Sequence, residues 1–301
     1  MENCRHNDGS AGDVDYGVIG AGYARHRRPD PRIVECLHRA LGDSRSVLNV
    51  GAGAGSYEPI DRVVTAIEPS ASMRAQRPSH LTRAIDAVAE ALPFPDDSFD
   101  ASMTTFSVHQ WTDIRVGLRE MRRVTRGPVV VLTCDPDRVS SFWLEMYAHE
   151  VLATEARRYP PIGLIAELVG RDTRVFAVPI PLGCTDGFNE AYYGRPELLL
   201  DESVRRACSA WSFLDAAAVA TFESELRRDL STGLWDSKYG YLRSQIPIGN
   251  SDSYREPVQD RGLVAERAGP VCADLPESED GDRVCGHFDE VTAYPAMTMN
   301  F

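Results

Sequence analysis

The sequence predicts an α/β fold in which a doubly wound, mainly parallel β-sheet carries helical insertions as a lid and a substrate cap. Apolar runs alternate with helical patterns along the first two-thirds of the chain, as in βαβ units. A glycine-rich turn directly follows the first apolar run, at residues 51–55. At 301 residues the chain is long enough to bury a sizeable core around such a sheet.

The elements follow one another in βαβ order. Strands are expected at 46–50, 63–67, 82–85, 99–105, 128–134 and 174–179. Helices are expected at 31–41, 70–76, 87–91, 113–126, 140–156, 196–209 and 213–231. Asp30 and Pro31 supply an N-cap and a first-turn proline for the earliest helix. Only 12 residues separate the first two strands, so their connecting helix should be little more than one turn.

These elements divide the chain into four parts. Residues 1–45 are expected to form an N-terminal helical lid, and residues 46–135 the nucleotide-binding core. Residues 136–250, which are helical and rich in aromatic side chains, should cap the ligand site and contribute a late strand. Residues 251–301 form an acidic tail that we expect to be irregular.

Composition excludes several classes of function. The formal charge of −13 disfavours a nucleic acid partner, because such binding depends on basic side chains that neutralise phosphates. The seven cysteines show no C-x-x-C spacing, which indicates reduced thiols and no metal site. The polar opening residues lack a signal-peptide core, and no apolar run is long enough to span a membrane. We therefore expect a cytoplasmic protein with no membrane partner.

The turn at residues 51–55 predicts a nucleotide-like ligand. Gly51, Gly53 and Gly55 follow a buried strand, where free backbone N–H groups meet the carboxyl edge of the sheet. The dinucleotide fingerprint requires glycine at position 56, where this chain has Ser56. Glu68 ends the second strand, in the position from which a carboxylate binds the hydroxyls of a ribose. The structural alternatives are that the glycines form only a tight turn between two elements and that Glu68 is only a solvent-exposed acid at the end of a strand.

A third element follows in register, over residues 89–113. An Ala-Glu pair, the turn Pro93-Phe94-Pro95 and a strand led by Asp100 would form a wall against a purine base. With these three motifs the chain resembles class I S-adenosylmethionine (SAM)-dependent methyltransferases, which are Rossmann-like. It is similar in particular to the bacterial small-molecule branch, and residues 180–201 resemble a stretch of actinobacterial members. The resemblance is specific over roughly residues 45–135.

The resemblance implies SAM as the cofactor and a role for each motif. The glycine turn would cradle the methionine part, Glu68 the ribose, and the following residues the adenine. The lid would contribute an aromatic ring and an arginine. The implied cofactor-binding residues are Tyr16, Arg28, Asn49, Gly51, Ala52, Gly53, Gly55, Ser56, Glu68, Pro69, Ser70, Met73, Ala89, Glu90, Thr105, Phe106 and Ser107. The chain departs from the family's pattern in its short helix after the glycine turn and in the absence of a recognisable seventh, antiparallel strand.

Four residues are candidates for the chemistry. His109 follows the fourth strand, where a base is needed only if the acceptor has a proton to lose. Packing beside Trp111 is the structural alternative. Tyr23 would contact the acceptor or simply seal the lid. Tyr192 and Tyr193 would either hold a flat or cationic acceptor or belong to the core of the cap.

We therefore expect methyl transfer to oxygen, nitrogen or carbon of a small, largely apolar or aromatic acceptor in bacterial secondary metabolism. Two alternatives stay open. One is a nucleic acid or protein methyltransferase, although TFSVHQW stands where [ND]-P-P-[YF] would mark methylation of exocyclic amines. The other is a non-catalytic nucleotide-binding protein of the same fold. A homo-oligomer is compatible with the sequence, which does not decide the oligomeric state.

Overall fold

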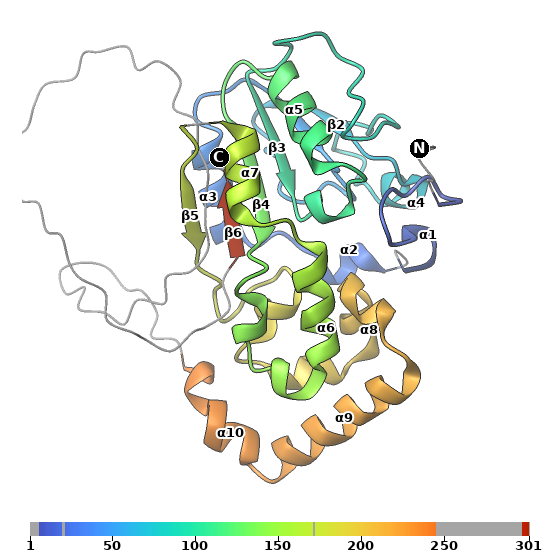
Figure 1. Cartoon of the computed structure of the whole chain (residues 1–301), viewed down its shortest axis with the longest axis vertical. Helices are drawn as coiled ribbons and strands as arrows, with labels where there is room; N and C mark the ends of the chain where they lie inside the picture. Colours follow the sequence, from blue (N-terminus) through green and yellow to red (C-terminus); the bar gives the residue numbers. More distant parts are fainter. Residues whose placement is uncertain (1–5, 20–21, 171, 245–296, 301) are drawn as a thin grey trace, which may run out of the picture.

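The computed structural model describes residues 6–19, 22–170, 172–244 and 297–300. Within these residues a six-stranded sheet has the order β2-β1-β3-β4-β6-β5. The strands are β1 (Ser46–Val50), β2 (Val63–Ile67), β3 (Ala101–Thr105), β4 (Val129–Cys134), β5 (Val175–Val178) and β6 (Met297–Asn300). Strands β1 to β4 pair in parallel, whereas β6 lies antiparallel between β4 and β5 (Figure 1). The predicted doubly wound, mainly parallel fold is confirmed.

The sheet is buried on both faces, which explains the continuous apolar runs of its strands. In β4, Val130 and Leu132 join one core cluster while Val129 and Val131 join the other. Helix α3 (Pro31–Ala40) supplies Ile33 and Leu37 to the first cluster. Helices α5 (Ile114–Val124) and α7 (Ile162–Val169) pack against each other and belong to the second cluster.

The helix starts follow from local capping signals. The side chain of Asp30 accepts a hydrogen bond from the backbone N–H of Arg32 and so caps α3. Asp113 caps α5 in the same way, and Asp215 caps α9 (Ala216–Ser231). Ser70 caps the short helix α4 (Ala71–Ala75). The cap at Asp30 is the one that the sequence predicts, because capping depends only on neighbours along the chain.

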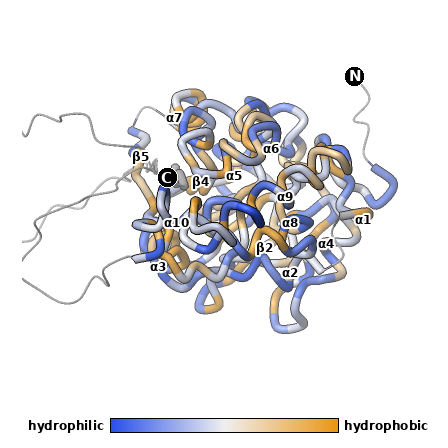
Figure 2. The backbone as a smooth tube through the Cα atoms, turned by 90° about the horizontal axis from the view of Figure 1, so that it is seen from below, coloured by the Kyte–Doolittle hydropathy of each residue, from blue (hydrophilic) through white to orange (hydrophobic). Residues whose placement is uncertain are grey.

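A helical block lies beyond the carboxyl edge of the sheet (Figure 1). It contains α6 (Glu145–Arg158), α8 (Glu202–Arg206), α9 and α10 (Leu234–Tyr239). Two single-turn helices, α1 (Tyr16–Ile19) and α2 (Tyr23–His26), lie beside its upper end. Hydrophobic and hydrophilic stretches are interspersed along the block's backbone, as expected for amphipathic helices (Figure 2). The short 3₁₀ helices are Val108–Gln110, Val139–Ser141, Asn189–Tyr192, Pro196–Leu200, Ser209–Phe213 and Gly240–Arg243.

Several predicted elements are wrong. Residues 87–91 form no helix and run as loop and turn toward Pro93. The turn from 51 to 62 contains no helix either, and the strand at 82–85 is reduced to a bridge between Ile85 and Ile67. The helix at 196–209 is broken at Asp201, whose extended backbone and side chain begin α8 instead.

The structure describes only residues 297–300 of the tail that was expected to be irregular. Residues 297–300 form the antiparallel strand that the sequence did not reveal, so the tail is not irregular throughout. The remainder of the acidic tail lies outside the described residues. In the described part of the chain no helix has the length and apolar character needed to cross a bilayer.

Candidate functional site

The glycine turn after β1 has a backbone that side chains disfavour. Gly51 has φ +67° and Gly53 has φ +51°, both in the left-handed region. A Cβ atom at Gly51 would lie 1.8 Å from Ser107 Oγ, so only glycine fits there. At Gly53 a Cβ atom would meet only Met73 Cε, at 3.4 Å. The turn thus brings bare backbone to the carboxyl edge of the sheet.

A buried ion pair between Arg77 and Glu58 stabilises the segment that contains this turn. Arg77 Nη2 donates to both carboxylate oxygens of Glu58, at 2.9 and 2.8 Å, and both side chains are almost fully buried. Asn49 Nδ2 donates to the same carboxylate over 2.9 Å. Asn49 is therefore a supporting residue that does not line a cavity, and Glu58 explains why residues 51–62 remain a turn.

Glu68 faces the glycine turn from the end of β2. Its Oε2 accepts a hydrogen bond from the backbone N–H of Gly53 and its Oε1 from that of Ser70, both at 2.8 Å. Burial raises the pKa of the Glu68 carboxyl, and the two backbone hydrogen bonds act in the opposite direction. Each oxygen keeps a second lone pair for a hydroxyl donor. The backbone of the glycine turn and of Ser70 thus fixes the orientation of the carboxylate at the first cavity.

A first cavity of about 820 Å³, partly open to solvent, lies at the ends of β1, β2 and β3. The predicted site residues that line it are Tyr16, Tyr23, Gly51, Ala52, Gly53, Ser56, Glu68, Pro69, Met73, Ala89, Glu90, Thr105, Phe106 and Ser107. The glycine turn, the acid and the purine wall therefore come together around one space.

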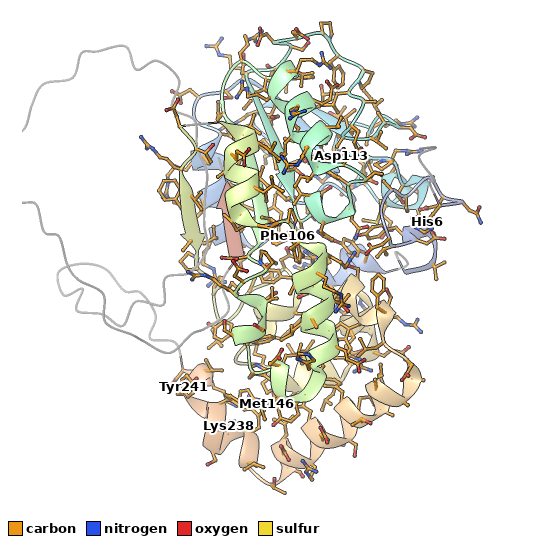
Figure 3. The ribbon with its side chains drawn as sticks, viewed as in Figure 1. His6, Phe106, Asp113, Met146, Lys238 and Tyr241 are labelled. Atoms are coloured by element: carbon orange, nitrogen blue, oxygen red, sulfur yellow. The ribbon has the colours of Figure 1, made fainter. Side chains whose placement is uncertain are left out.

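A second, smaller cavity adjoins the first and extends toward the helical block, and its free space of about 410 Å³ includes space open to solvent. Tyr16, Tyr23, Arg27 and Phe106 line both cavities. Phe106 lies where the sheet meets the helical block (Figure 3). Its φ of +50° is unusual for a bulky residue, and such strain is found mainly at functional sites.

The N-terminal segment is attached to both sides of the site. Arg27 Nε donates to Asp186 Oδ1 over 2.6 Å, and the Tyr57 hydroxyl donates to Asp186 Oδ2 over 2.7 Å. The Arg27 guanidinium also lies 5.3 Å from the ring centre of Tyr23 and 5.2 Å from that of Phe106. Asp186 makes these contacts from the segment before the Asn189–Tyr192 3₁₀ helix. Sequence spacing gives no signal for this partnership.

A second attachment involves Asp8. Its carboxylate accepts hydrogen bonds from Ser70 and Ser72, at 2.5 and 2.9 Å, and from Ser10. Burial alone would raise the pKa of Asp8, but these hydrogen bonds lower it to about 2. The carboxylate therefore remains ionised and ties the N-terminal segment to α4. Ser70 thus supports the site without lining it.

His109 lines the second cavity and does not line the first. Its ring lies 4.6 Å from that of Tyr159, and within the described residues its buried Nδ1 has no hydrogen-bond partner. Burial lowers the pKa of His109 well below its ordinary value, and the nearby Arg158 and Arg27 lower it further. The imidazole is therefore neutral at pH 7 and can accept a proton.

Two buried carboxyl groups face the same cavity. Glu155 comes from α6 and Glu190 from the Asn189–Tyr192 3₁₀ helix. Burial raises the pKa of Glu190 to about 7, and burial followed by the proximity of Glu190 raises the pKa of Glu155. The sequence predicted neither residue, since isolated glutamates on helices resemble ordinary surface acids.

The other predicted residues lie elsewhere. Arg28 is exposed, and the neighbouring Arg27 lines the first cavity in its place. The sequence alone does not show which of two adjacent arginines faces a cavity. Gly55 lines neither cavity, because its backbone faces Leu81. Tyr192 and Tyr193 pack in the core and line neither cavity. In the portion of the chain that the structure describes, no three His, Cys, Asp or Glu residues are grouped as a metal site.

The chain has a Rossmann-like fold with a cavity at the carboxyl edge of its sheet, and comparison with known proteins adds to this. Residues 48–131 match the family model described as "Methyltransferase domain". The uncharacterized methyltransferase YcgJ of Bacillus subtilis is 33% identical over 91 residues, 27% of this chain and 36% of YcgJ. A malonyl-[acyl-carrier protein] O-methyltransferase of Halorhodospira halophila is 28% identical over 131 residues, 38% of this chain and 44% of that protein. The chain thus spans less than half the length of these two curated relatives.

A solved structure resembles the chain over more of its length. It is of a protein from Anabaena variabilis assigned as a methyltransferase of an antibiotic biosynthesis pathway. The two match with a TM-score of 0.69 and 24% identity, over 91% of this chain and 98% of that chain. At this identity the likeness establishes the fold. Taken together, these matches show a methyltransferase domain at residues 48–131, in a chain that has the fold of the Anabaena protein.

Proposed function

We propose that this chain transfers the methyl group of SAM to a small molecule bound in the second cavity. The observation that carries the proposal is the common wall of Tyr16, Tyr23, Arg27 and Phe106 between the two cavities. One cavity has the features of a SAM site, and the other is enclosed by the helical block. The residues that line both cavities place the two spaces side by side. An in-line displacement requires the donor and the acceptor to meet directly where the spaces join, with no side chain between them.

The residues of the first cavity fit SAM. Glu68 would bind the ribose hydroxyls, and the bare backbone at Gly51 and Gly53 leaves the space that side chains would fill. Ala89 and Glu90 would lie along the adenine, with Thr105 to Ser107 beneath the sulfonium. When bound there, SAM supplies a methyl group on an intrinsically good leaving group. Arg27, already paired with Asp186, is placed to steady the amino acid end.

The second cavity indicates the kind of acceptor. Phe106 and Phe188 stack with ring centres 5.5 Å apart, which suits a molecule with a flat or aromatic body. His109 and Tyr159 stand beside them as groups able to accept or share a proton. We propose residues 6–45 as a lid, residues 136–244 as the acceptor cap, and a natural-product-like acceptor of bacterial secondary metabolism.

Calorimetry followed by mass spectrometry tests the proposal. SAM should bind, and NAD should not, because the turn lacks the third glycine of the dinucleotide fingerprint. Incubation with SAM and a panel of small aromatic acceptors should give a product heavier by one methylene unit. SAM binding without any transfer across a broad panel would favour a non-catalytic binding protein. Binding of NAD in preference to SAM would refute the proposal.

A further inference from the structure

We propose that the Glu155 and Glu190 side chains form a recognition site for a protonated amine on the acceptor. The inference rests on the proposed function, since it concerns the second cavity of the same site. Both residues line that cavity, and both side chains are among the buried polar groups, with 8% and 2% of their surfaces exposed. Two acids in one enclosed space require compensation, because isolated buried charge is costly.

The surrounding protein compensates these acids only in part. Glu155 Oε1 accepts a hydrogen bond from Asn189 Nδ2 over 2.8 Å, and Asn189 Oδ1 accepts one from Trp211 Nε1 over 2.8 Å. These bonds fix the carboxyl group in place. Glu155 Oε2 is buried and has no hydrogen-bond partner within the described residues. One oxygen of a fixed carboxyl therefore remains available to a donor from a ligand.

The neighbouring arginines are already paired elsewhere. Arg27 forms its ion pair with Asp186, at 2.6 Å. Arg158 donates from Nε and Nη2 to Asp13, at 2.8 and 2.9 Å, and from Nη1 to Ser209. Among the residues that the structure describes, neither arginine forms a direct ion pair with Glu155 or Glu190. The carboxyl pair, whose pKa values burial raises, is thus left without a cation in contact, and a cation there would favour its ionised form.

An ammonium group is the ligand that best complements these two carboxyl groups. Such a group donates three hydrogen bonds and carries one positive charge. The charge would be balanced by one ionised carboxyl group, and one of the hydrogen bonds would go to Glu155 Oε2, which has no partner within the described residues. The rings of Phe106 and Phe188, on the wall of the same cavity, would contact an apolar body attached to the amine. A carboxylate ligand would meet like charge instead, and a neutral alcohol would leave the charge uncompensated.

The test measures binding without turnover, on protein saturated with S-adenosylhomocysteine. Titration with phenethylamine, 2-phenylethanol and phenylacetate compares a cation, a neutral molecule and an anion of similar shape. Phenethylamine should bind at least about tenfold more tightly than the alcohol, a factor that one charge-assisted hydrogen bond supplies. Equal binding, tighter binding of the alcohol or phenylacetate, or absent binding of the amine would overturn the inference.

Three variants test whether Glu155 and Glu190 cause the preference for the amine over the alcohol. Glu190→Gln and Glu155→Gln should each reduce the preference for the amine severalfold and leave the affinity for 2-phenylethanol unchanged. Glu150→Gln is the matched control, because Glu150 is an exposed acid on the same helix as Glu155. A preference that survives both substitutions refutes the site, and if a variant fails to fold, the wild-type series still decides.

Binding of S-adenosylhomocysteine is measured separately in the same experiment. Its failure would count against the proposed function, not against the amine site. In that case the three probes are titrated into the protein alone, where the same order of affinities is expected. A preference for the amine there supports the carboxyl pair independently, and its absence rejects it.

Discussion

The Arg27 guanidinium donates to the Asp186 carboxylate across 159 residues of sequence, at 2.6 Å between Nε and Oδ1. Tyr57, at the end of the glycine turn, donates to the other oxygen of the same carboxylate. The Asp186 side chain therefore joins the N-terminal segment to the glycine turn. Asp186 is almost fully buried, so the pair is shielded from solvent.

We expect Asp186→Asn to destabilise the protein by about 3 kcal/mol, because it leaves the Arg27 charge buried and unpaired. Urea denaturation followed by circular dichroism measures the loss. Glu35→Gln removes a partner from the exposed Arg39–Glu35 pair and should change stability by less than about 0.5 kcal/mol. Equal effects of the two substitutions would show that the buried pair has no special role.

Glu68→Ala should weaken SAM binding by about 1.5 to 3 kcal/mol, the range for hydrogen bonds to a charged group. Glu68→Gln keeps the shape of the side chain and should lose less affinity. Calorimetry with SAM measures both, with the exposed Asp43→Asn as a control for charge. Unchanged affinity in Glu68→Ala would remove Glu68 from the ribose site.

Two glycine substitutions should separate folding from binding. Gly51→Ala places a Cβ atom against Ser107 and should lower the melting temperature. Gly53→Val meets no close backbone, so the variant should fold yet lose SAM binding, because its branches fill the cavity and resist the left-handed turn. A folded Gly53→Val protein with normal affinity for SAM would contradict the proposed position of the cofactor.

For an acceptor with a proton to lose, His109→Gln should lower the rate by roughly 10² to 10⁴, the usual contribution of a general base. Because burial lowers the pKa of His109, the acid limb of the pH–rate profile should lie below pH 6.5. The variant should lack this limb. A small rate change with an unaltered profile would leave His109 as a packing residue beside Tyr159.

Stability should depend on pH through Glu190. Between about pH 4.5 and pH 7 the unfolded chain releases this proton while the folded chain retains it, so stability falls as pH rises through that window. Glu190→Gln removes this loss and should be more stable than wild type at pH 8, by on the order of 2 kcal/mol. Denaturation curves at pH 5 and pH 8 test this, with Glu150→Gln as the control. A variant with the wild-type pH dependence would show that Glu190 is not buried as a charged group.

The sequence was sufficient for features that depend on neighbours along the chain. Apolar runs locate β1 to β4, and Asp30 and Asp113 mark helix starts, because strand burial and capping are local. Glu68 was identifiable because it follows the glycine turn by a fixed spacing. Asp186 and Glu190 were not identifiable, since their partners are brought together only by tertiary packing. The strand 297–300 was missed because four residues carry too little pattern.

If a methyl donor and an acceptor occupy the two cavities as proposed, the residues that line both cavities couple the two binding events. Tyr16, Tyr23, Arg27 and Phe106 cannot adjust to one ligand without changing the surface offered to the other. Linkage requires the effect to be mutual: if the methyl donor tightens the acceptor's hold tenfold, the acceptor tightens the donor's hold by the same factor. The order in which the two arrive would then be a property of this wall, and substitutions at Phe106 would alter cooperativity as well as affinity.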